Sequence, residues 1–467
     1  MANWSEEFYW ETAAALSKRL AAREFRAMDA ARAFCRRLEQ LGPRYRALTL
    51  SLQDDALRQA KNVDREIKRG RHKGPLHGVP CGVSDLLSVA GRPTAWGSAL
   101  FAGQVFPDDA AAVERLRKAG ALIAGKLACC ELGGAGMPPE WPGDAPGGGL
   151  NPYDVSRWAG GASGAAAAAV AAGLVTFSVG VDTCGSLLRP AGYCGVTALR
   201  PTFGTVSRFG AMAAAWTVDS IAIAARSAED CGHILAAISG TDLRDPGSPG
   251  RRFYYAPQYS QPVEQLRAGY VPAEFSAATP PALRPPLQAA LAALRAAGPK
   301  LVELPAPDLP CPEALELILS AESAAAFSDL IADGRTGRLA DARQRTGLRA
   351  GAELKASDYL RAMRVRRLVQ EWLGRQMAGA DLLISPLNFG FPPAAGGSTS
   401  STAAALPALL AAGILAGLPL LAVPAGEAEG LPAGVLLAAR PRMENVLLKA
   451  AAAMRAAAPG VARQPKY

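Results

Sequence analysis

GGASGAAAAAVAAGLVTFSVGVDTCGSLLRPA, residues 160–191, holds two turns of small residues separated by an alanine-rich segment. The first turn, Gly160–Gly164, precedes Ala165–Ala172, which we expect to form a helix deep in the core because alanine lets backbones approach closely. Backbone N–H groups at such a turn can bind an anion or an oxyanion. The second turn ends at Ser186, a candidate nucleophile beside possible oxyanion donors. Most serines in glycine turns only satisfy backbone groups, so spacing alone leaves both roles open.

The segments on both sides of this stretch alternate short apolar strands with helices. We expect strands at Val79–Val83, Ala121–Ala124, Lys300–Leu304, Asp381–Ser385, Leu420–Val423 and Gly434–Ala438. We expect helices at Ala110–Ala119, Pro286–Ala297 and roughly Met443–Ala457. This alternation predicts an α/β layered fold. Half of the 467 residues are hydrophobic and 19% are charged, as is usual for a globular chain with a large core.

Four regions depart from this alternation. Residues 5–70 show helical periodicity and predict two or three amphipathic helices that cover another layer. Residues 134–161 are rich in glycine and proline and predict an extended loop, and residues 240–285 predict a poorly patterned connection. Residues 401–426 carry no charge, but prolines and glycines interrupt them. We therefore expect a short buried helix and a buried strand there, and no membrane span.

Composition and charge argue against several classes of function. The net charge of +9 comes mainly from scattered arginines, denser at residues 68–73 and at Arg251-Arg252, with no interleaved aromatic residues. This pattern predicts a solvated surface and no nucleic-acid partner. Eight cysteines and three histidines without paired CxxC motifs argue against zinc, and we expect no metal or organic cofactor. The polar, acidic start without a signal peptide and the cysteines in apolar segments predict a cytoplasmic protein with reduced thiols and no membrane association.

A series of short motifs along the chain resembles the amidase signature family. In chain order they are GPLHGVP (74–80), GK (125–126), NP (151–152), GGASG (160–164), DTCGS (182–186), YCGV (193–196), LRPTFG (199–204), VDS (218–220), ARS (225–227), SP (385–386), AGLP (416–419) and VP (423–424). The combination and order of these motifs are specific to the family. The resemblance covers roughly residues 8–458.

The resemblance implies a single compact α/β domain. Its amidase-signature fold would have a large mixed central sheet of about eleven strands with helices on both faces. Residues 1–70 would form an N-terminal helical region packed on a core of residues 71–467. The family hydrolyses amide C–N bonds with a lysine, a serine held by a cis peptide bond and a nucleophilic serine. A buried lysine whose pKa is lowered by desolvation can accept the proton that the middle serine relays from the nucleophile.

Only one position of this triad keeps its residue. The family lysine falls on Ser84, the cis serine on Ala162 and the nucleophile on Ser186. Ser163 matches the supporting second serine of the glycine turn, and Cys184 replaces the first glycine of the nucleophile motif. Ser84 has a hydroxyl but no useful basicity, and the methyl group of Ala162 cannot relay a proton. We therefore expect a pseudo-amidase, a family member that has lost amide hydrolysis.

The alternative is an active or altered amidase that still uses Ser186. It would need a substitute base or a different nucleophile. His77 lies close to Ser84 in sequence, and the thiols of Cys81 and Cys184 need less activation than a hydroxyl. Loss of a general base and its relay costs several orders of magnitude in rate, so the inactive interpretation is preferred.

Arg189 keeps a binding role open. It lies three residues after Ser186 in a Ser-x-x-Arg-Pro-Ala arrangement that resembles malonamidase-type members, where the arginine meets a substrate carboxylate. Pairing with a core acid such as Asp182 is the structural alternative. A retained pocket would bind a small acidic or amide ligand through Arg189 and the residues Thr183, Cys184, Gly185 and Ser163. A third interpretation is a protein that pairs with an enzyme, as the amidase-like component of the glutamyl-tRNA amidotransferases does, which the chain also resembles.

Overall fold

The computed structural model describes residues 5–137, 147–248, 251–395, 406–458 and 464–465. Its centre is an 11-stranded mixed sheet in the order β1-β3-β2-β6-β8-β7-β12-β13-β11-β9-β10, which confirms the expected architecture. The strands are β1 Leu48–Ser51, β2 Pro80–Ser84, β3 Leu122–Leu127, β6 Phe177–Asp182, β7 Thr197–Arg200, β8 Ser220–Ala225, β9 Arg267–Tyr270, β10 Lys300–Glu303, β11 Leu382–Pro386, β12 Leu420–Ala428 and β13 Leu431–Ala439. The β3–β2–β6 and β11–β9–β10 neighbours are parallel, and the other pairs are antiparallel.

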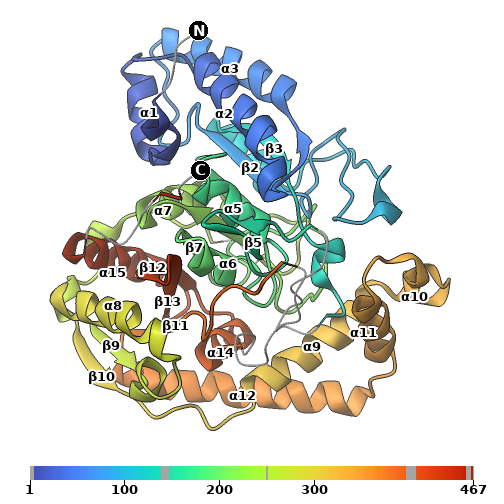
Figure 1. Cartoon of the computed structure of the whole chain (residues 1–467), viewed down its shortest axis with the longest axis vertical. Helices are drawn as coiled ribbons and strands as arrows, with labels where there is room; N and C mark the ends of the chain where they lie inside the picture. Colours follow the sequence, from blue (N-terminus) through green and yellow to red (C-terminus); the bar gives the residue numbers. More distant parts are fainter. Residues whose placement is uncertain (1–4, 138–146, 249–250, 396–405, 459–463, 466–467) are drawn as a thin grey trace.

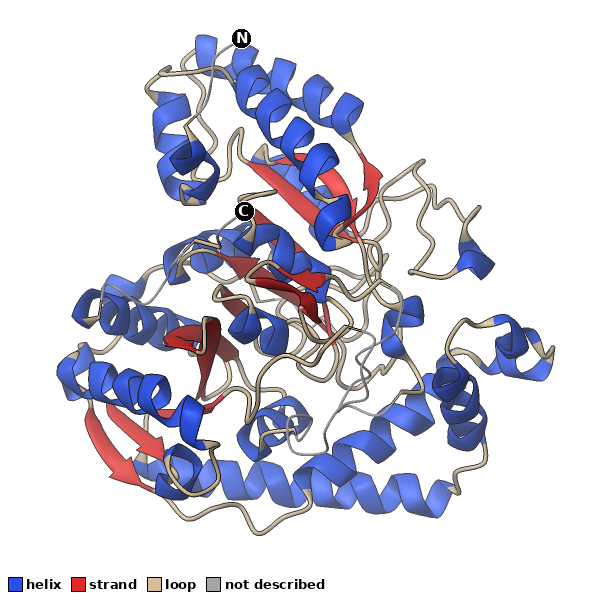
Figure 2. Cartoon of the chain, in the orientation of Figure 1, coloured by secondary structure: helices blue, strands red, loops and turns tan. Residues whose placement is uncertain are grey.

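Helices cover both faces of this sheet (Figures 1 and 2). They are α1 Ala13–Ala21, α2 Ala27–Leu41, α3 Gln53–Lys68, α4 Ala111–Ala119, α5 Gly164–Ala171, α6 Leu188–Tyr193, α7 Ala228–Ile238, α8 Arg284–Ala296, α9 Cys311–Ala326, α10 Ser328–Ala332, α11 Ala342–Ala352, α12 Ala356–Gly379, α14 Ala408–Ala416 and α15 Glu444–Ala457. One apolar cluster joins α4, α7, α8 and α15 to the sheet, and another joins α5, α6, α9, α12 and α14 to it. None of the described helices combines the length and apolarity that crossing a membrane would require.

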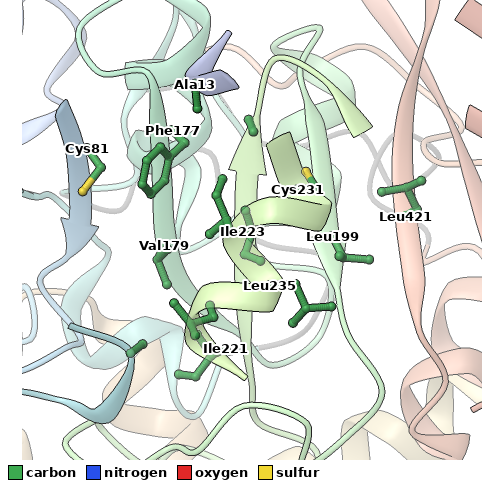
Figure 3. Packing of buried hydrophobic residues seen from close by; sticks show 14 of the residues in the cluster. Ala13, Cys81, Phe177, Val179, Leu199, Ile221, Ile223, Cys231, Leu235 and Leu421 are labelled. Atoms are coloured by element: carbon green, nitrogen blue, oxygen red, sulfur yellow. The ribbon is translucent and has the colours of Figure 1, made fainter. Parts of the chain in front are cut away.

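The alanine-rich helix α5 lies in the core, as expected from its composition. All its residues from Gly164 to Ala171 are buried, and the Ser178 hydroxyl of β6 donates to the Ala166 carbonyl at 2.9 Å. A Cβ this small allows the helix axis to come close to the sheet. Larger side chains fill the other face of the same strands, where Val179 and Ile223 pack near Leu235 of α7 (Figure 3).

The structure corrects several expectations about individual segments. Residues 5–70 contain an edge strand, β1, which pairs with β3, besides their helices. The connection 240–285 contains β9, which pairs with β10 and β11. The loop 134–161 contains a separate hairpin of β4 (Leu150–Asn151) and β5 (Asp154–Trp158), and parts of it and of 401–426 lie outside the described residues. The strands concerned have two to five residues, too few for periodicity to reveal them.

Candidate functional site

The candidate site lies where the parallel neighbours β2 and β6 end. Ser84 is the last residue of β2, and β6 leads directly into the turn that carries Ser186. Ser163 is the residue before the first turn of α5. A Cβ on Gly180 of β6 would lie 3.4 Å from the Ser84 Cβ and 3.7 Å from the Ser163 Oγ, so these serines flank Gly180. The fold therefore brings residues 84, 163 and 186 together from three separate segments.

The hydroxyl of Ser186 is bonded to the backbone. It donates to the Val181 carbonyl at 3.2 Å and accepts a long hydrogen bond of 3.5 Å from the Thr183 N–H. The Ser163 hydroxyl donates to the same carbonyl at 2.8 Å, and the Ser163 N–H donates to the Ser186 carbonyl at 3.1 Å. The two serines thus share one acceptor, and the Ser186 proton is directed at a carbonyl that cannot take it up.

The two altered triad positions are both buried. Ser84 is 1% exposed, and its hydroxyl oxygen accepts from the Leu86 N–H at 3.3 Å. Ala162 packs against Cys130, and its carbonyl accepts from the Cys130 N–H at 3.1 Å. No cis peptide bond occurs within the described residues. Gly161, just before Ala162, has φ +80°, and a Cβ there would lie 2.7 Å from the Ser186 carbonyl oxygen, so only glycine fits.

The turn before Ser186 is organised by the buried carboxylate of Asp182. This carboxylate accepts from the N–H groups of Gly185 (2.9 Å), Leu187 (2.9 Å) and Leu188 (3.0 Å). It also forms a 3.0 Å ion pair with Arg200, whose guanidinium is fully buried and whose pKa is lowered by that burial. The sequence analysis did not assign Arg200 to the site, although it lies within the LRPTFG motif.

Thr183 and Cys184 complete this turn. The Thr183 hydroxyl donates to Asp219 at 2.8 Å, and the same carboxyl accepts from the N–H groups of Ala214 and Ala215. Burial raises the pKa of Asp219. Cys184 is half-buried, and desolvation raises the pKa of its thiol to about 12. A thiol of that pKa is protonated at neutral pH and is a poor substitute nucleophile.

Arg189 does not pair with Asp182, so the structural alternative considered for it is wrong. Its Nε donates to the Asn388 Oδ1 at 3.1 Å, and the Asn388 amide donates back to the Arg189 carbonyl at 3.2 Å. The arginine is 7% exposed and lies on α6, directly after the Ser186 turn. Asn388, which the sequence analysis missed, thus fixes the direction of the guanidinium stem.

His77 does not reach this site. Its Nε2 lies 2.8 Å from a Glu66 carboxylate oxygen, and the Lys73 N–H approaches its Nδ1 at 3.4 Å. Burial lowers the pKa of His77. The residue precedes β2, whereas Ser84 ends it, so the length of that strand separates them. The thiol of Cys81, within β2, is fully buried and its pKa is raised by desolvation.

A second buried lysine lies near Ser84 but on the other side of the sheet. The register pairs Val83 with Lys126 and Ser84 with Leu127. Because neighbouring residues of a strand point to opposite faces, the side chains of Ser84 and Lys126 leave the sheet in opposite directions. The Lys126 ammonium lies 2.8 Å from Asp85, donates to the Pro93 carbonyl at 3.0 Å and bonds to the Thr94 hydroxyl. Lys126 is therefore no replacement for the family lysine.

No group of three or more His, Cys, Asp or Glu side chains among the described residues is arranged to hold a metal ion. The fold and the site together define a class of α/β proteins built around a serine turn at the strand ends. The Amidase family model matches residues 29–448, and the chain belongs to the amidase signature family.

Several relatives match the chain along nearly its whole length. The GatA-type component of the glutamyl-tRNA(Gln) amidotransferase of Carboxydothermus hydrogenoformans is 30% identical over 95% of this chain and 96% of its own. The peptide amidase of Stenotrophomonas maltophilia is 30% identical, with a TM-score of 0.83 over 98% of both chains. A chain from a vestigial protein complex, described as revealing the evolutionary origins of an s-triazine catabolic enzyme, has 28% identity and a TM-score of 0.88. That match covers 97% of this chain and 100% of the other.

Proposed function

We propose that this chain is a pseudo-amidase that has lost amide hydrolysis and keeps the Ser186 pocket to bind a small carboxylate or amide. The observation that carries the proposal is the hydrogen bond from the Ser186 hydroxyl to the Val181 carbonyl. Among the described residues, no lysine, histidine or carboxylate makes a hydrogen bond to that hydroxyl. A serine hydroxyl is essentially never ionised at neutral pH, so it needs such a base to attack an amide.

The loss of the base is the larger of the two changes. General acid–base catalysis by one group contributes about 10²–10⁴-fold in rate, and groups that act as a unit fail together. Ser84 cannot supply a base, and Ala162 cannot connect one to Ser186. The oxyanion turn, by contrast, keeps its support from Asp182 and Arg200. This combination supports binding without turnover.

Arg189 and Ser163 support the proposed ligand class. The Arg189 guanidinium follows the Ser186 turn and is oriented by Asn388, which suits recognition of a planar carboxylate. A Cβ on Gly185 would lie 3.5 Å from the Arg189 Cγ, so the arginine stem borders the turn itself. A small ligand with a carboxylate at one end and an amide at the other matches these two neighbouring features.

Intact-mass analysis after exposure to a fluorophosphonate tests the loss of activation. We expect no adduct on the unmodified chain and a single adduct on the Ser84→Lys/Ala162→Ser variant. The Ser186→Ala variant is the blank. A specific adduct on the unmodified chain that Ser186→Ala removes would refute the proposal and establish the alternative, an active or altered amidase.

A second candidate function, that of a partner subunit in a larger assembly, is supported by two of the relatives. One is a component of an amidotransferase, and another comes from a vestigial protein complex. Mass spectrometry of proteins that co-purify with an affinity-tagged chain from its own cells tests this function. A stoichiometric second protein would support it, and a chain recovered alone would count against it.

A further inference from the structure

A second concave site lies away from Ser186. It is a groove of about 670 Å³ between the segment Arg251–Ser260 and the N-terminal end of α15, with Thr202–Thr205 along its floor. We call it the Arg251 groove. None of the residues that the sequence analysis assigned to the amidase-type site lines it. The amidase-type interpretation therefore leaves this groove without a role.

The wall of the groove is held in place by α15. The Asn445 side chain accepts from the Ala256 N–H at 3.2 Å and donates to the Tyr254 carbonyl at 3.0 Å. Lys449, one helical turn further on, donates to the Ser260 carbonyl at 3.0 Å. Phe253 is buried beneath this wall, and its N–H donates to the Ser239 hydroxyl at 3.0 Å. A wall pinned at both ends is preorganised, which lowers the entropic cost of binding.

Three arginines give this groove an unbalanced positive charge. Arg251, Arg252 and Arg442 line it, and none of them forms an ion pair with an acidic side chain in the described part of the chain. Glu444 is the acidic residue in its lining, but it is 2% exposed. Its carboxylate already accepts from the Thr202 N–H at 2.9 Å and the Thr202 hydroxyl at 2.6 Å. Carboxylates of a ligand would therefore meet three guanidinium groups that lack a partner.

Large apolar side chains stand exposed around the same groove. Tyr254 is 68% exposed and Tyr259 is 87% exposed, and Met443 beside Arg442 is 46% exposed. The Arg252 guanidinium lies over the Tyr254 ring at 5.7 Å. Tyrosine, methionine and arginine are the residue types that interfaces between proteins favour. Their concentration on one preorganised wall distinguishes the groove from the scattered arginines elsewhere on the surface.

We propose that the Arg251 groove binds an acidic peptide segment of a partner protein, with carboxylates on the arginines and apolar side chains against the tyrosines. The charge of the groove and its exposed rings select this occupant. A nucleic acid fits less well, because a tracking phosphate backbone needs an extended basic stripe. The groove instead has three arginines around one hollow. The proposal is independent of the chemistry at Ser186.

Fluorescence anisotropy with labelled peptides tests the proposal on the full chain. The probe is a fluorescein-labelled peptide of Glu-Glu-Phe repeats, compared with Gln-Gln-Phe and Glu-Glu-Ser repeats and with a labelled single-stranded oligonucleotide. We expect the Glu-Glu-Phe peptide to bind more tightly than the other three probes. Arg251→Ala/Arg252→Ala should weaken this binding about tenfold and Tyr259→Ala by several-fold.

The matched control removes two other exposed arginines, Arg69 and Arg71, which border a different surface. Arg69→Ala/Arg71→Ala should leave the affinity unchanged, and so should Ser186→Ala. Equal losses in the control variant would reduce the effect to general attraction between charges and overturn the proposal. Tighter binding of the oligonucleotide through Arg251 and Arg252, or no binding of the Glu-Glu-Phe peptide, would overturn it as well.

Discussion

Ser163 and Ser186 donate their hydroxyl protons to the same atom, the carbonyl oxygen of Val181, at 2.8 and 3.2 Å. A carbonyl oxygen has two lone pairs and can accept both bonds. The shared acceptor orients Ser186 without activating it, because a backbone carbonyl is not a base at neutral pH. The nucleophile position is thus retained structurally, while the neighbouring positions 84 and 162 lack the groups that would draw its proton away.

Restoring both altered positions should restore amide hydrolysis. We expect Ser84→Lys/Ala162→Ser to release ammonia from a small monoamide at least about 10²-fold faster than the unmodified chain. Each single variant should gain little, because a base without a relay cannot reach Ser186. A double variant that folds normally but stays inactive would show that another departure, such as Cys184, also blocks the reaction.

Ligand binding at the Ser186 pocket should depend on Arg189. Small dicarboxylates or monoamides at about 100 times their Kd should stabilise the chain by about 2.7 kcal/mol in thermal unfolding. Arg189→Gln should abolish this shift, and Asn388→Ala should reduce it because Asn388 positions the arginine. Arg361→Gln, on an exposed part of α12, is the control. An unchanged shift in Arg189→Gln would exclude Arg189 as the anchor.

The buried ion pair beneath the turn should be important for stability. Arg200→Met should lower the free energy of unfolding by about 3–5 kcal/mol, because it leaves the Asp182 carboxylate buried without its cation. Denaturant unfolding measures the change. The exposed Arg361→Met should alter it by less than about 0.5 kcal/mol. A similarly small effect of Arg200→Met would mean that the backbone N–H groups alone satisfy Asp182.

Helix α5 should not tolerate larger side chains. Ala167 is fully buried, and Ala167→Leu should destabilise the chain by about 1–3 kcal/mol through overpacking. Ala325→Leu at an exposed position of α9 serves as the matched control and should be nearly neutral. Equal effects of the two substitutions in denaturant unfolding would contradict the close approach of α5 to the sheet.

Acid should remove a stabilising contribution of Asp242. Hydrogen bonds from Arg244 lower the pKa of this carboxyl from its ordinary value of 3.8 to about 2. A carboxyl with a lowered folded-state pKa stabilises the fold above its unfolded pKa, and the contribution is lost as pH falls from about 4 to about 2. In Asp242→Asn this part of the pH dependence of unfolding should vanish, whereas the exposed Asp329→Asn should keep it. Identical pH profiles of Asp242→Asn and the unmodified chain would refute the assignment.

Most of the large elements were predictable from local patterns. The alanine composition of residues 165–172 located a core helix, and the expected strands near residues 79–83 and 434–438 became β2 and β13. The edge strand β1 and the inner strand β9 were missed. Each has four residues and is stabilised by pairing with strands distant in sequence, a contribution that local periodicity does not contain.

The sequence by itself determined the family motifs, the retained Ser186 and the loss of lysine and serine at positions 84 and 162, because residue identity and order along the chain are enough for these. Only the tertiary structure decided which groups meet. It paired Asp182 with Arg200 and directed Arg189 to Asn388. It also placed Lys126 on the face opposite Ser84 and gathered Arg251, Arg252 and Arg442 around one groove. Such contacts depend on sheet register and on packing between segments up to about two hundred residues apart, which no local sequence pattern encodes.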